Sequence, residues 1–132
     1  MKKKNKPSKF KNKIIIVDGI KFRSIAESLY YKHLKKLKLI EVVSHFTLQP
    51  KFILQPGFEI RGETIPKVTY IADFLVTDNK GNERVIDVKG FPTPLAKLKR
   101  VLFLNQYPAL PLHWIQLKNH RWKTMDGELF EL

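Results

Sequence analysis

Two acidic residues stand out because of the strand-like segments that contain them. Residues 70–76 are apolar on both faces of a strand apart from Asp73, and an unpaired buried carboxylate is energetically costly. In residues 85–89, the period of two places Asp87 and Lys89 on one face. The loop between the two segments fits a hairpin, so we expect the two aspartates to approach each other from adjacent strands. Their mutual repulsion indicates that a cation binds between them.

A divalent metal ion is the cation that this arrangement favours. Carboxylate oxygens suit Mg²⁺ or Mn²⁺, and the carbonyl oxygen of Val88 could add another ligand. Lys89 would then lie beside the metal, where it can orient water or stabilise charge on a phosphate. The alternative is a structural ion pair in which Lys89 neutralises Asp87 or Asp73.

The sequence argues against several other kinds of site. It contains no cysteine, so any metal must be held by oxygen or imidazole ligands. It contains no Gly-rich phosphate loop, so neither ATP-driven chemistry nor a nucleotide cofactor is expected. The histidines show no spacing that would place two of them on one helical face, and we interpret them as packing or phosphate-contacting residues. They are His33, His45, His113 and His120.

A hairpin and a helix are predicted ahead of these strands. The dipeptide Asp18-Gly19 tolerates the positive φ angles of a two-residue turn between the short apolar runs of residues 13–22. From Ser24 to about residue 39, apolar residues recur every three or four positions, as in a helix. Ser24 and Glu27 form a capping box, and this capping role accounts for Glu27 without any catalytic function.

Further strands and a second helix are predicted in the rest of the chain. In chain order they are an edge strand at 48–57, a polar loop at 57–66, strands at 67–77 and 83–89, a helix from Thr93-Pro94 to about Tyr107, and a strand at 110–117. The buried stripe of the second helix is expected to consist of Leu95, Leu98, Val101 and Leu102. No element is assigned to residues 121–132. Residues 14–132 are expected to form one domain.

The chain is strongly basic, with 25 Lys and Arg against 12 Asp and Glu and a formal net charge of +13. Such a charge opposes compaction unless a polyanion neutralises it, which makes nucleic acid the expected partner. A membrane surface is the competing polyanion, but the basic residues are scattered and no segment is apolar enough to span a bilayer. The start of the chain has no signal-peptide core, so we expect a cytoplasmic protein.

Two basic segments are candidates for contact with phosphates. Residues 1–13 contain seven lysines and no acid, which is typical of an arm that lies along nucleic acid, or alternatively of a solubilising tail. The second helix offers further cations, although a solvated helix face explains them equally well. The candidate phosphate contacts are Lys3, Lys4, Lys6, Lys97, Lys99 and Arg100.

Four short blocks in the sequence resemble those of a known superfamily. They are Phe22-x-Ser24-x-x-Glu27, Leu48-Gln49-Pro50-x-Phe52, Tyr70-x-x-Asp73-Phe74 and Asp87-Val88-Lys89-Gly90. In this order, across residues 14–105, they resemble the PD-(D/E)XK nucleases, and most closely small phage-encoded proteins with that fold. The resemblance implies an α/β fold with a restriction-endonuclease-like core, in which helices flank a central mixed sheet.

The same resemblance implies roles for the site residues. Asp73 and Asp87 would be metal ligands, Glu27 a further ligand or a residue that orients water, and Lys89 the catalytic lysine. Ala72 stands where the superfamily pattern has its proline, a departure that many members share.

These roles would make the protein a metal-dependent DNA endonuclease, in which water activated by Mg²⁺ or Mn²⁺ hydrolyses a phosphodiester. A small domain has little room for a base-reading module, so recognition of DNA shape is expected. Within the superfamily this is similar to the Holliday-junction resolvases, which are small, basic and homodimeric. The alternatives are a phage nuclease that does not act on junctions, a non-catalytic nucleic-acid-binding protein on a nuclease fold, and an RNA-binding protein.

Overall fold

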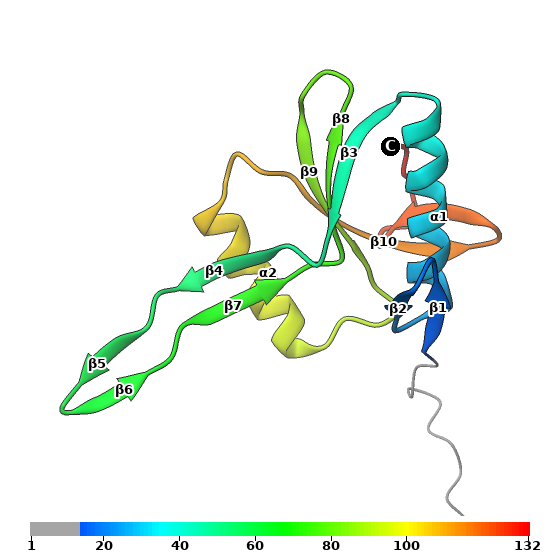
Figure 1. The fold of residues 1–132 in the computed structure, drawn as a ribbon. Coiled ribbons are helices and arrows are strands. Elements are labelled where there is room, and N and C mark those ends of the chain that lie inside the picture. The colour runs from blue at the N-terminus through cyan, green and yellow to red at the C-terminus, as the bar shows by residue number, and fades with distance from the viewer. Residues whose placement is uncertain (1–13) are drawn as a thin grey trace, which may run out of the picture.

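A five-stranded mixed sheet forms the centre of the protein, as a computed structural model that describes residues 14–132 shows (Figure 1). Its strand order is β11-β10-β9-β8-β3, and all neighbours are antiparallel except β9 and β10. Its strands are β3 (Val43–Leu48), β8 (Phe74–Asp78), β9 (Glu83–Val88), β10 (Leu112–Lys118) and β11 (Arg121–Thr124). The parallel pair requires a crossover connection, which α2 (Pro94–Gln106) provides. The expected α/β fold with a central mixed sheet is therefore present.

Helix α1 (Ile25–Leu39) covers one face of the sheet. Tyr30 and Leu34 on this helix are fully buried, and they belong to one core cluster with Phe74, Ile86 and Ile115 of the sheet. This cluster is the first of two cores. The helix begins at the predicted place, with the Ser24 hydroxyl accepting a hydrogen bond from the Glu27 amide at 3.1 Å.

The predicted hairpin precedes α1 and consists of β1 (Ile15–Val17) and β2 (Ile20–Phe22). Asp18 and Gly19 both have positive φ angles, 53° and 77°, as a two-residue turn of this kind requires. The part of this prediction that falls on residue 13 lies outside the described residues.

On the opposite face of the sheet, α2 packs through Phe103, which is fully buried. Thr93 caps this helix and Pro94 is its first residue, as predicted. The predicted buried stripe is wrong, because Leu95, Leu98, Val101 and Leu102 are all exposed. An aromatic cluster sets the rotation of the helix instead: the Phe103 ring lies 5.0 Å from Phe52, 5.6 Å from Tyr70 and 5.0 Å from Tyr107.

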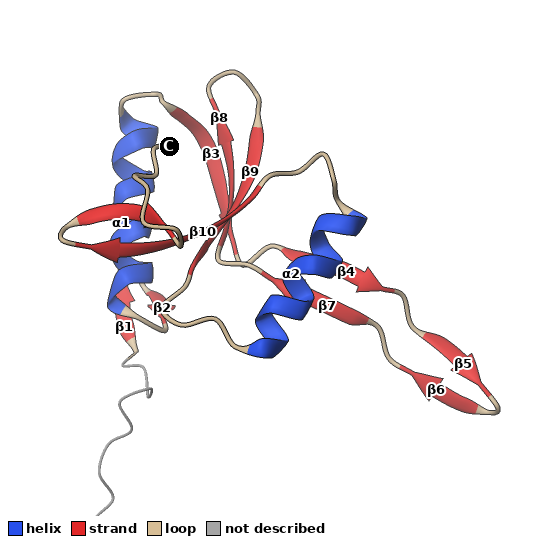
Figure 2. Cartoon of the chain, turned by 180° about the vertical axis from the view of Figure 1, so that it is seen from behind, coloured by secondary structure: helices blue, strands red, loops and turns tan. Residues whose placement is uncertain are grey.

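A long two-stranded ribbon extends from the body of the protein (Figures 1 and 2). Its strands are β4 (Lys51–Gln55), β5 (Phe58–Ile60), β6 (Glu63–Ile65) and β7 (Val68–Ile71). β4 pairs with β7 at its base, β5 pairs with β6 at its tip, and α2 lies across the base. Residues 57–66 are thus not the polar loop that the sequence suggested, and residues 48–57 do not form one edge strand.

The ribbon bends where its two halves meet, because Pro56 and Pro66 interrupt the pairing there. Gly57 lies at this bend against the opposite strand. A Cβ atom at this position would lie 3.0 Å from the carbonyl oxygen of Ile65, so the close approach of the two backbones requires glycine. Along the described residues, no helix is long and apolar enough to cross a membrane.

Candidate metal centre

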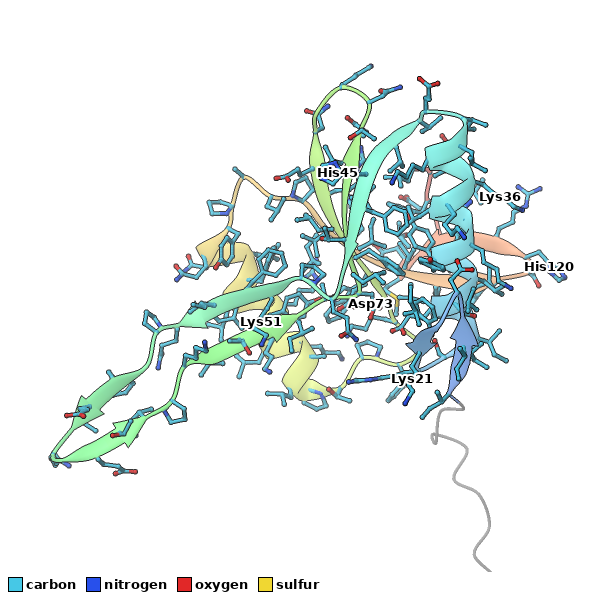
Figure 3. The ribbon with its side chains drawn as sticks, in the orientation of Figure 1. Lys21, Lys36, His45, Lys51, Asp73 and His120 are labelled. Carbon is cyan, nitrogen blue, oxygen red and sulfur yellow. The ribbon has the colours of Figure 1, made fainter. Side chains whose placement is uncertain are left out.

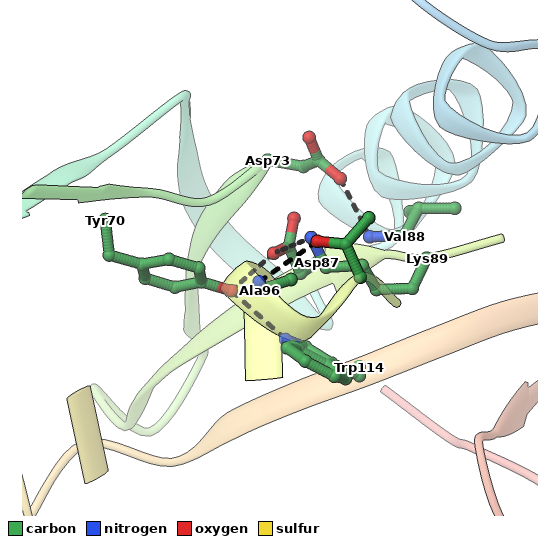
Figure 4. Close-up of polar contacts among 8 residues, drawn as sticks. Tyr70, Asp73, Asp87, Val88, Lys89, Ala96 and Trp114 are labelled. Carbon is green, nitrogen blue, oxygen red and sulfur yellow. Dashed lines mark hydrogen bonds and ion pairs between the residues drawn. The ribbon is translucent and has the colours of Figure 1, made fainter. Parts of the chain in front are cut away.

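Asp73 and Asp87 meet where the ribbon joins the central sheet. The predicted strand at 67–77 is interrupted at Ala72 and Asp73, so that β7 belongs to the ribbon and β8 to the sheet. Phe74 pairs with Ile86 across β8 and β9, and continuing this register by one residue places Asp73 opposite Asp87. Figure 3 shows Asp73 at this junction, and Figure 4 shows the two acids together.

The carboxyl group of Asp73 is held at the end of β9 and lies close to two other acids. Its Oδ2 atom accepts a hydrogen bond of 2.8 Å from the backbone amide of Val88 (Figure 4). Burial raises the pKa of this carboxyl group well above its usual range, and the neighbouring carboxyl groups of Glu27 and Asp87 raise it further. Asp73 therefore has two other acids near it, and a cation would relieve the repulsion among these carboxyl groups.

Asp87 is 3% exposed, and the polar side chains of Tyr70 and Lys89 contact its carboxylate. Tyr70 donates a hydrogen bond to its Oδ2 atom, and the ammonium nitrogen of Lys89 lies 3.1 Å from the same oxygen. Trp114 in turn donates from its Nε1 atom to the Tyr70 hydroxyl at 3.1 Å (Figure 4). Burial, followed by the charge of Asp87, raises the pKa of Tyr70, so the phenol stays protonated and acts as the donor.

The sequence did not reveal Tyr70 and Trp114 as site residues. Tyr70 lies in the same short block as Asp73, and its three-residue distance from that acid was a usable signal. Trp114 lies opposite Asp87 in the parallel register of β9 and β10. No local feature indicates this partner, since the pairing depends on the crossover through α2.

Lys89 lies just beyond the end of β9. The ion pair with Asp87 that the sequence offered as an alternative is present in this structure. The ammonium group also lies 5.3 Å from the centre of the Trp114 ring, and the Arg100 guanidinium lies 5.5 Å from that ring. Two cations therefore lie over the aromatic side chain that supports Tyr70.

Glu27 combines a capping position with a place next to Asp73. Its Oε1 atom accepts a hydrogen bond of 3.2 Å from the amide of Arg23, one residue before the capping residue itself. Glu27 and Asp73 also line one small cavity of about 100 Å³, together with Lys21 and Gln49. Glu27 therefore caps the helix and faces the same space as Asp73.

The oxygen donors of this cluster suit Mg²⁺ or Mn²⁺, because carboxylates and a backbone carbonyl are hard ligands. Three carboxyl groups, from Glu27, Asp73 and Asp87, are available, and the carbonyl oxygen of Val88 adds a possible fourth donor. In the conformation described for residues 14–132, however, no three His, Asp or Glu side chains are grouped to enclose a metal ion. The donors of Lys89, Tyr70 and Val88 occupy two of the carboxylate oxygens instead.

The predicted phosphate contacts on α2 lie near this cluster in two separate hollows. Lys97 and Arg100 line a cavity of about 550 Å³ beside Trp114. Lys99 lines another of about 260 Å³ together with Lys89 and Tyr70. The three remaining candidates, Lys3, Lys4 and Lys6, lie outside the described residues.

Comparison with known proteins places the chain in one family. Residues 7–123 match the profile of a family described as "Protein of unknown function (DUF1064)". A search of curated proteins found no match, and neither did a search of solved structures. The match covers the hairpin, both helices, the ribbon and every residue of the acidic cluster.

Proposed function

Because the chain belongs to the DUF1064 family, we propose a function from the site itself: a divalent-metal-dependent DNA endonuclease that hydrolyses phosphodiester bonds, selectively in branched DNA. One observation supports this most strongly. The half-buried carboxyl group of Asp73 has both Glu27, which is distant in the chain, and the buried Asp87 as neighbours, and Lys89 lies at hydrogen-bonding distance from Asp87. Clustered acids beside a lysine are a typical arrangement for metal-assisted hydrolysis.

Glu27, Asp73 and Asp87 would hold the metal through carboxylate oxygens, with the carbonyl of Val88 as a further donor. Gathering these acids in a partly buried position is unfavourable without a positive charge, and the raised pKa of Asp73 reflects this. When bound, Mg²⁺ or Mn²⁺ supplies Lewis-acid chemistry that stabilises negative charge on a phosphate.

The remaining residues of the cluster have separate tasks in this proposal. Tyr70, supported by Trp114, fixes the orientation of the Asp87 carboxylate. Lys89 is a flexible ammonium group next to that carboxylate and is available to stabilise charge on a phosphate oxygen. Its pairing with Asp87 in this structure keeps it at the site when no phosphate is present.

DNA is the favoured substrate because cations surround the acidic cluster. Lys97, Lys99 and Arg100 line the two hollows next to it, and the chain as a whole carries a net charge of +13. These contacts suit phosphates and DNA shape more than base edges. The selectivity for four-way junctions, with paired incisions by a homodimer, rests on likeness to resolvases and is a fold-level analogy.

The test compares cleavage of a synthetic four-way junction with cleavage of a linear duplex of the same sequences, in Mg²⁺ or Mn²⁺. We expect the junction to be cut faster, and Asp87→Asn to abolish cleavage. Glu83→Gln is the matched control, because Glu83 is an exposed acid at the other end of β9. If the parent chain cuts no DNA in either metal, the endonuclease proposal fails. Equal rates on both substrates would exclude the junction preference alone.

One observation favours a second candidate, a non-catalytic nucleic-acid-binding protein. Lys89, Tyr70 and the Val88 amide already satisfy oxygens of Asp87 and Asp73 without a metal. Tight, salt-dependent DNA binding without cleavage would support the binding function over the endonuclease function. Asp87→Asn should then bind DNA as tightly as the parent chain.

A further inference from the structure

The protein has two exposed apolar surfaces, one on helix α2 and one at the end of the ribbon. The first, the α2 outer face, consists of Leu95, Leu98, Val101 and Leu102, whose exposed fractions lie between 37% and 60%. The second is the ribbon tip, residues 58–65, where Phe58 and Ile60 are 45% and 46% exposed. Apolar groups gathered on a protruding element are typical of a contact surface.

The pairing of β5 with β6 determines which side chains share one face of the ribbon tip. Phe58 lies opposite Ile65, and Ile60 lies opposite Glu63. Because directly opposed residues, and residues two positions apart, project to the same side of a ribbon, these four side chains form one face. Its composition is three apolar groups and one carboxylate.

The ribbon tip cannot reach the α2 outer face of its own chain. Phe52, at the base of the ribbon, packs against Phe103 on the inner side of α2. Ile60 lies eight residues further out, which at roughly 3.3 Å per residue corresponds to about 26 Å of extended chain. The views in Figures 1 and 2 agree, since both show the tip pointing away from α2.

The two surfaces are complementary in charge as well as in apolar character. Helix α2 contains three basic residues and no acid, and exposed Lys97 flanks the apolar face. The ribbon tip contains two acids, Glu59 and Glu63, and one base, Arg61. Because the chain is so basic overall, a net negative segment is uncommon on it, and it matches a basic helix better than it matches DNA phosphates.

We propose that the partner of each surface is a second copy of this chain, with the ribbon tip of each copy seated on the α2 outer face of the other. A two-fold axis allows both contacts to form at once, because residue i of one copy meets residue j of its partner and the reverse. Glu63 then faces Lys97 of the second copy. This arrangement gives an interface to the homodimer named in the proposed function, would hold without nuclease activity, and would pair Lys97 with a carboxylate of the partner instead of with a phosphate.

The oligomeric state of the full chain is the first measurement, by sedimentation velocity without DNA. We expect a species of twice the 15.5 kDa chain mass. Ile60→Ser and Leu98→Ser should each weaken the dimer about tenfold or more, since each removes a central apolar contact. Leu39→Ser is the matched control, because Leu39 is 83% exposed at the end of α1, away from both surfaces. Circular dichroism verifies that each variant folds.

Charge reversal tests the direct contact. Glu63→Lys and Lys97→Glu should each weaken the dimer, and the double variant should recover it. If each single variant weakened the dimer only by destabilising the folded chain, the two losses would add in the double variant. Recovery of dimer affinity in the double variant would therefore indicate a direct contact between residues 63 and 97. If the double variant is weaker than either single one, these residues do not meet.

Disulfide trapping separates this arrangement from a helix-to-helix dimer, and the absence of cysteine in the chain makes the test clean. Ile60→Cys mixed with Leu98→Cys should form a mixed disulfide on oxidation, whereas neither variant should form one alone. A disulfide in Leu98→Cys by itself would show that the α2 faces pair directly, and would overturn the exchange. A monomer at all concentrations, with weaker DNA binding by Ile60→Ser, would assign the ribbon tip to DNA instead.

Discussion

Trp114 donates a hydrogen bond to the hydroxyl of Tyr70 at 3.1 Å, although the two residues are 44 positions apart. The same hydroxyl donates to Asp87, so a chain of two hydrogen bonds connects β10, the ribbon and the end of β9. An indole N–H can only donate and a carboxylate accepts, so the Tyr70 hydroxyl accepts from Trp114 and donates to Asp87. The orientation of the Asp87 carboxylate therefore depends on two residues that would never contact a metal themselves.

Tyr70→Phe should lower cleavage about 10- to 100-fold, the usual effect of losing a residue that orients a metal ligand. It should also lower the free energy of unfolding by roughly 1–3 kcal/mol, because the Trp114 indole loses its acceptor. Rates measured across a range of Mn²⁺ concentrations, alongside urea unfolding, give both quantities. Tyr107→Phe is the matched control, since its hydroxyl donates to the Ile53 carbonyl away from the cluster. Equal loss of activity in both variants would contradict a positioning role for Tyr70.

Two substitutions should distinguish the helix-capping role of Glu27 from its role in the candidate metal centre. Glu27→Gln keeps an oxygen acceptor for the Arg23 amide and removes only the charge, so stability should hold while cleavage falls. Ser24→Ala removes the cap, and should cost about 1 kcal/mol of stability while cleavage persists. Thermal melting and a cleavage assay on both variants give the comparison. Full activity in Glu27→Gln would show that Glu27 only caps the helix.

Mn²⁺ should raise the melting temperature of the DNA-free protein, because a ligand that binds only the folded chain stabilises it. At a concentration of about 100 times Kd, the expected gain is about 2.7 kcal/mol. Asp73→Asn and Asp87→Asn should remove this gain, whereas Glu83→Gln should keep it. Differential scanning fluorimetry with and without EDTA measures the effect. The same shift in all four proteins would mean that the metal binds elsewhere.

The contribution of His33 and His113 to stability should fall as the pH drops below about 6.5, whereas the raised pKa of Asp73 acts in the opposite direction. Burial lowers the pKa of His33 and of His113, and the charges of Lys36 and Arg84, respectively, lower them further. The unfolded chain therefore binds protons at a higher pH than the folded chain, and stability is lost as the pH falls through the unfolded value.

Urea midpoints at pH 7.5 and 5.5 measure this dependence on pH. Relative to the parent chain, the double variant His33→Gln/His113→Gln should have its midpoint shifted in favour of the folded state at pH 5.5 compared with pH 7.5, because it lacks the two histidines. His120→Gln, in the exposed turn between β10 and β11, serves as the control. If the double variant keeps the full difference, other groups cause the acid sensitivity.

The parts of the fold that local chemistry determines could be predicted from the sequence. Ser24 and Thr93 cap the two helices as expected, and Asp18-Gly19 turns the first hairpin. The alternation in residues 85–89 placed Asp87 on the correct strand. Each of these features depends on residues within about four positions of one another, so a single sequence contains the whole signal.

Features that depend on distant partners could not be predicted. The stripe at Leu95, Leu98 and Val101 has helical spacing and was expected to be buried. Phe103 packs against Phe52 and Tyr70 instead, so the helix buries a different face. The ribbon tip was missed because its two strands have only three residues each, too few to show alternation. The proximity of Glu27 to Asp73 was expected only from the resemblance, because it arises when α1 and the sheet pack together and no local pattern contains it.

The interruption at Ala72 and Asp73 gives the ribbon and the acidic cluster a common pivot. The Ala72 amide donates to the Pro50 carbonyl and the Gln49 amide donates to the Asp73 carbonyl, so both strands of the ribbon are anchored at this one level. The backbone of Asp73 thus belongs to the root of the ribbon, while its carboxyl group belongs to the acidic cluster. The ribbon and the candidate metal centre are therefore attached to the sheet through one and the same residue.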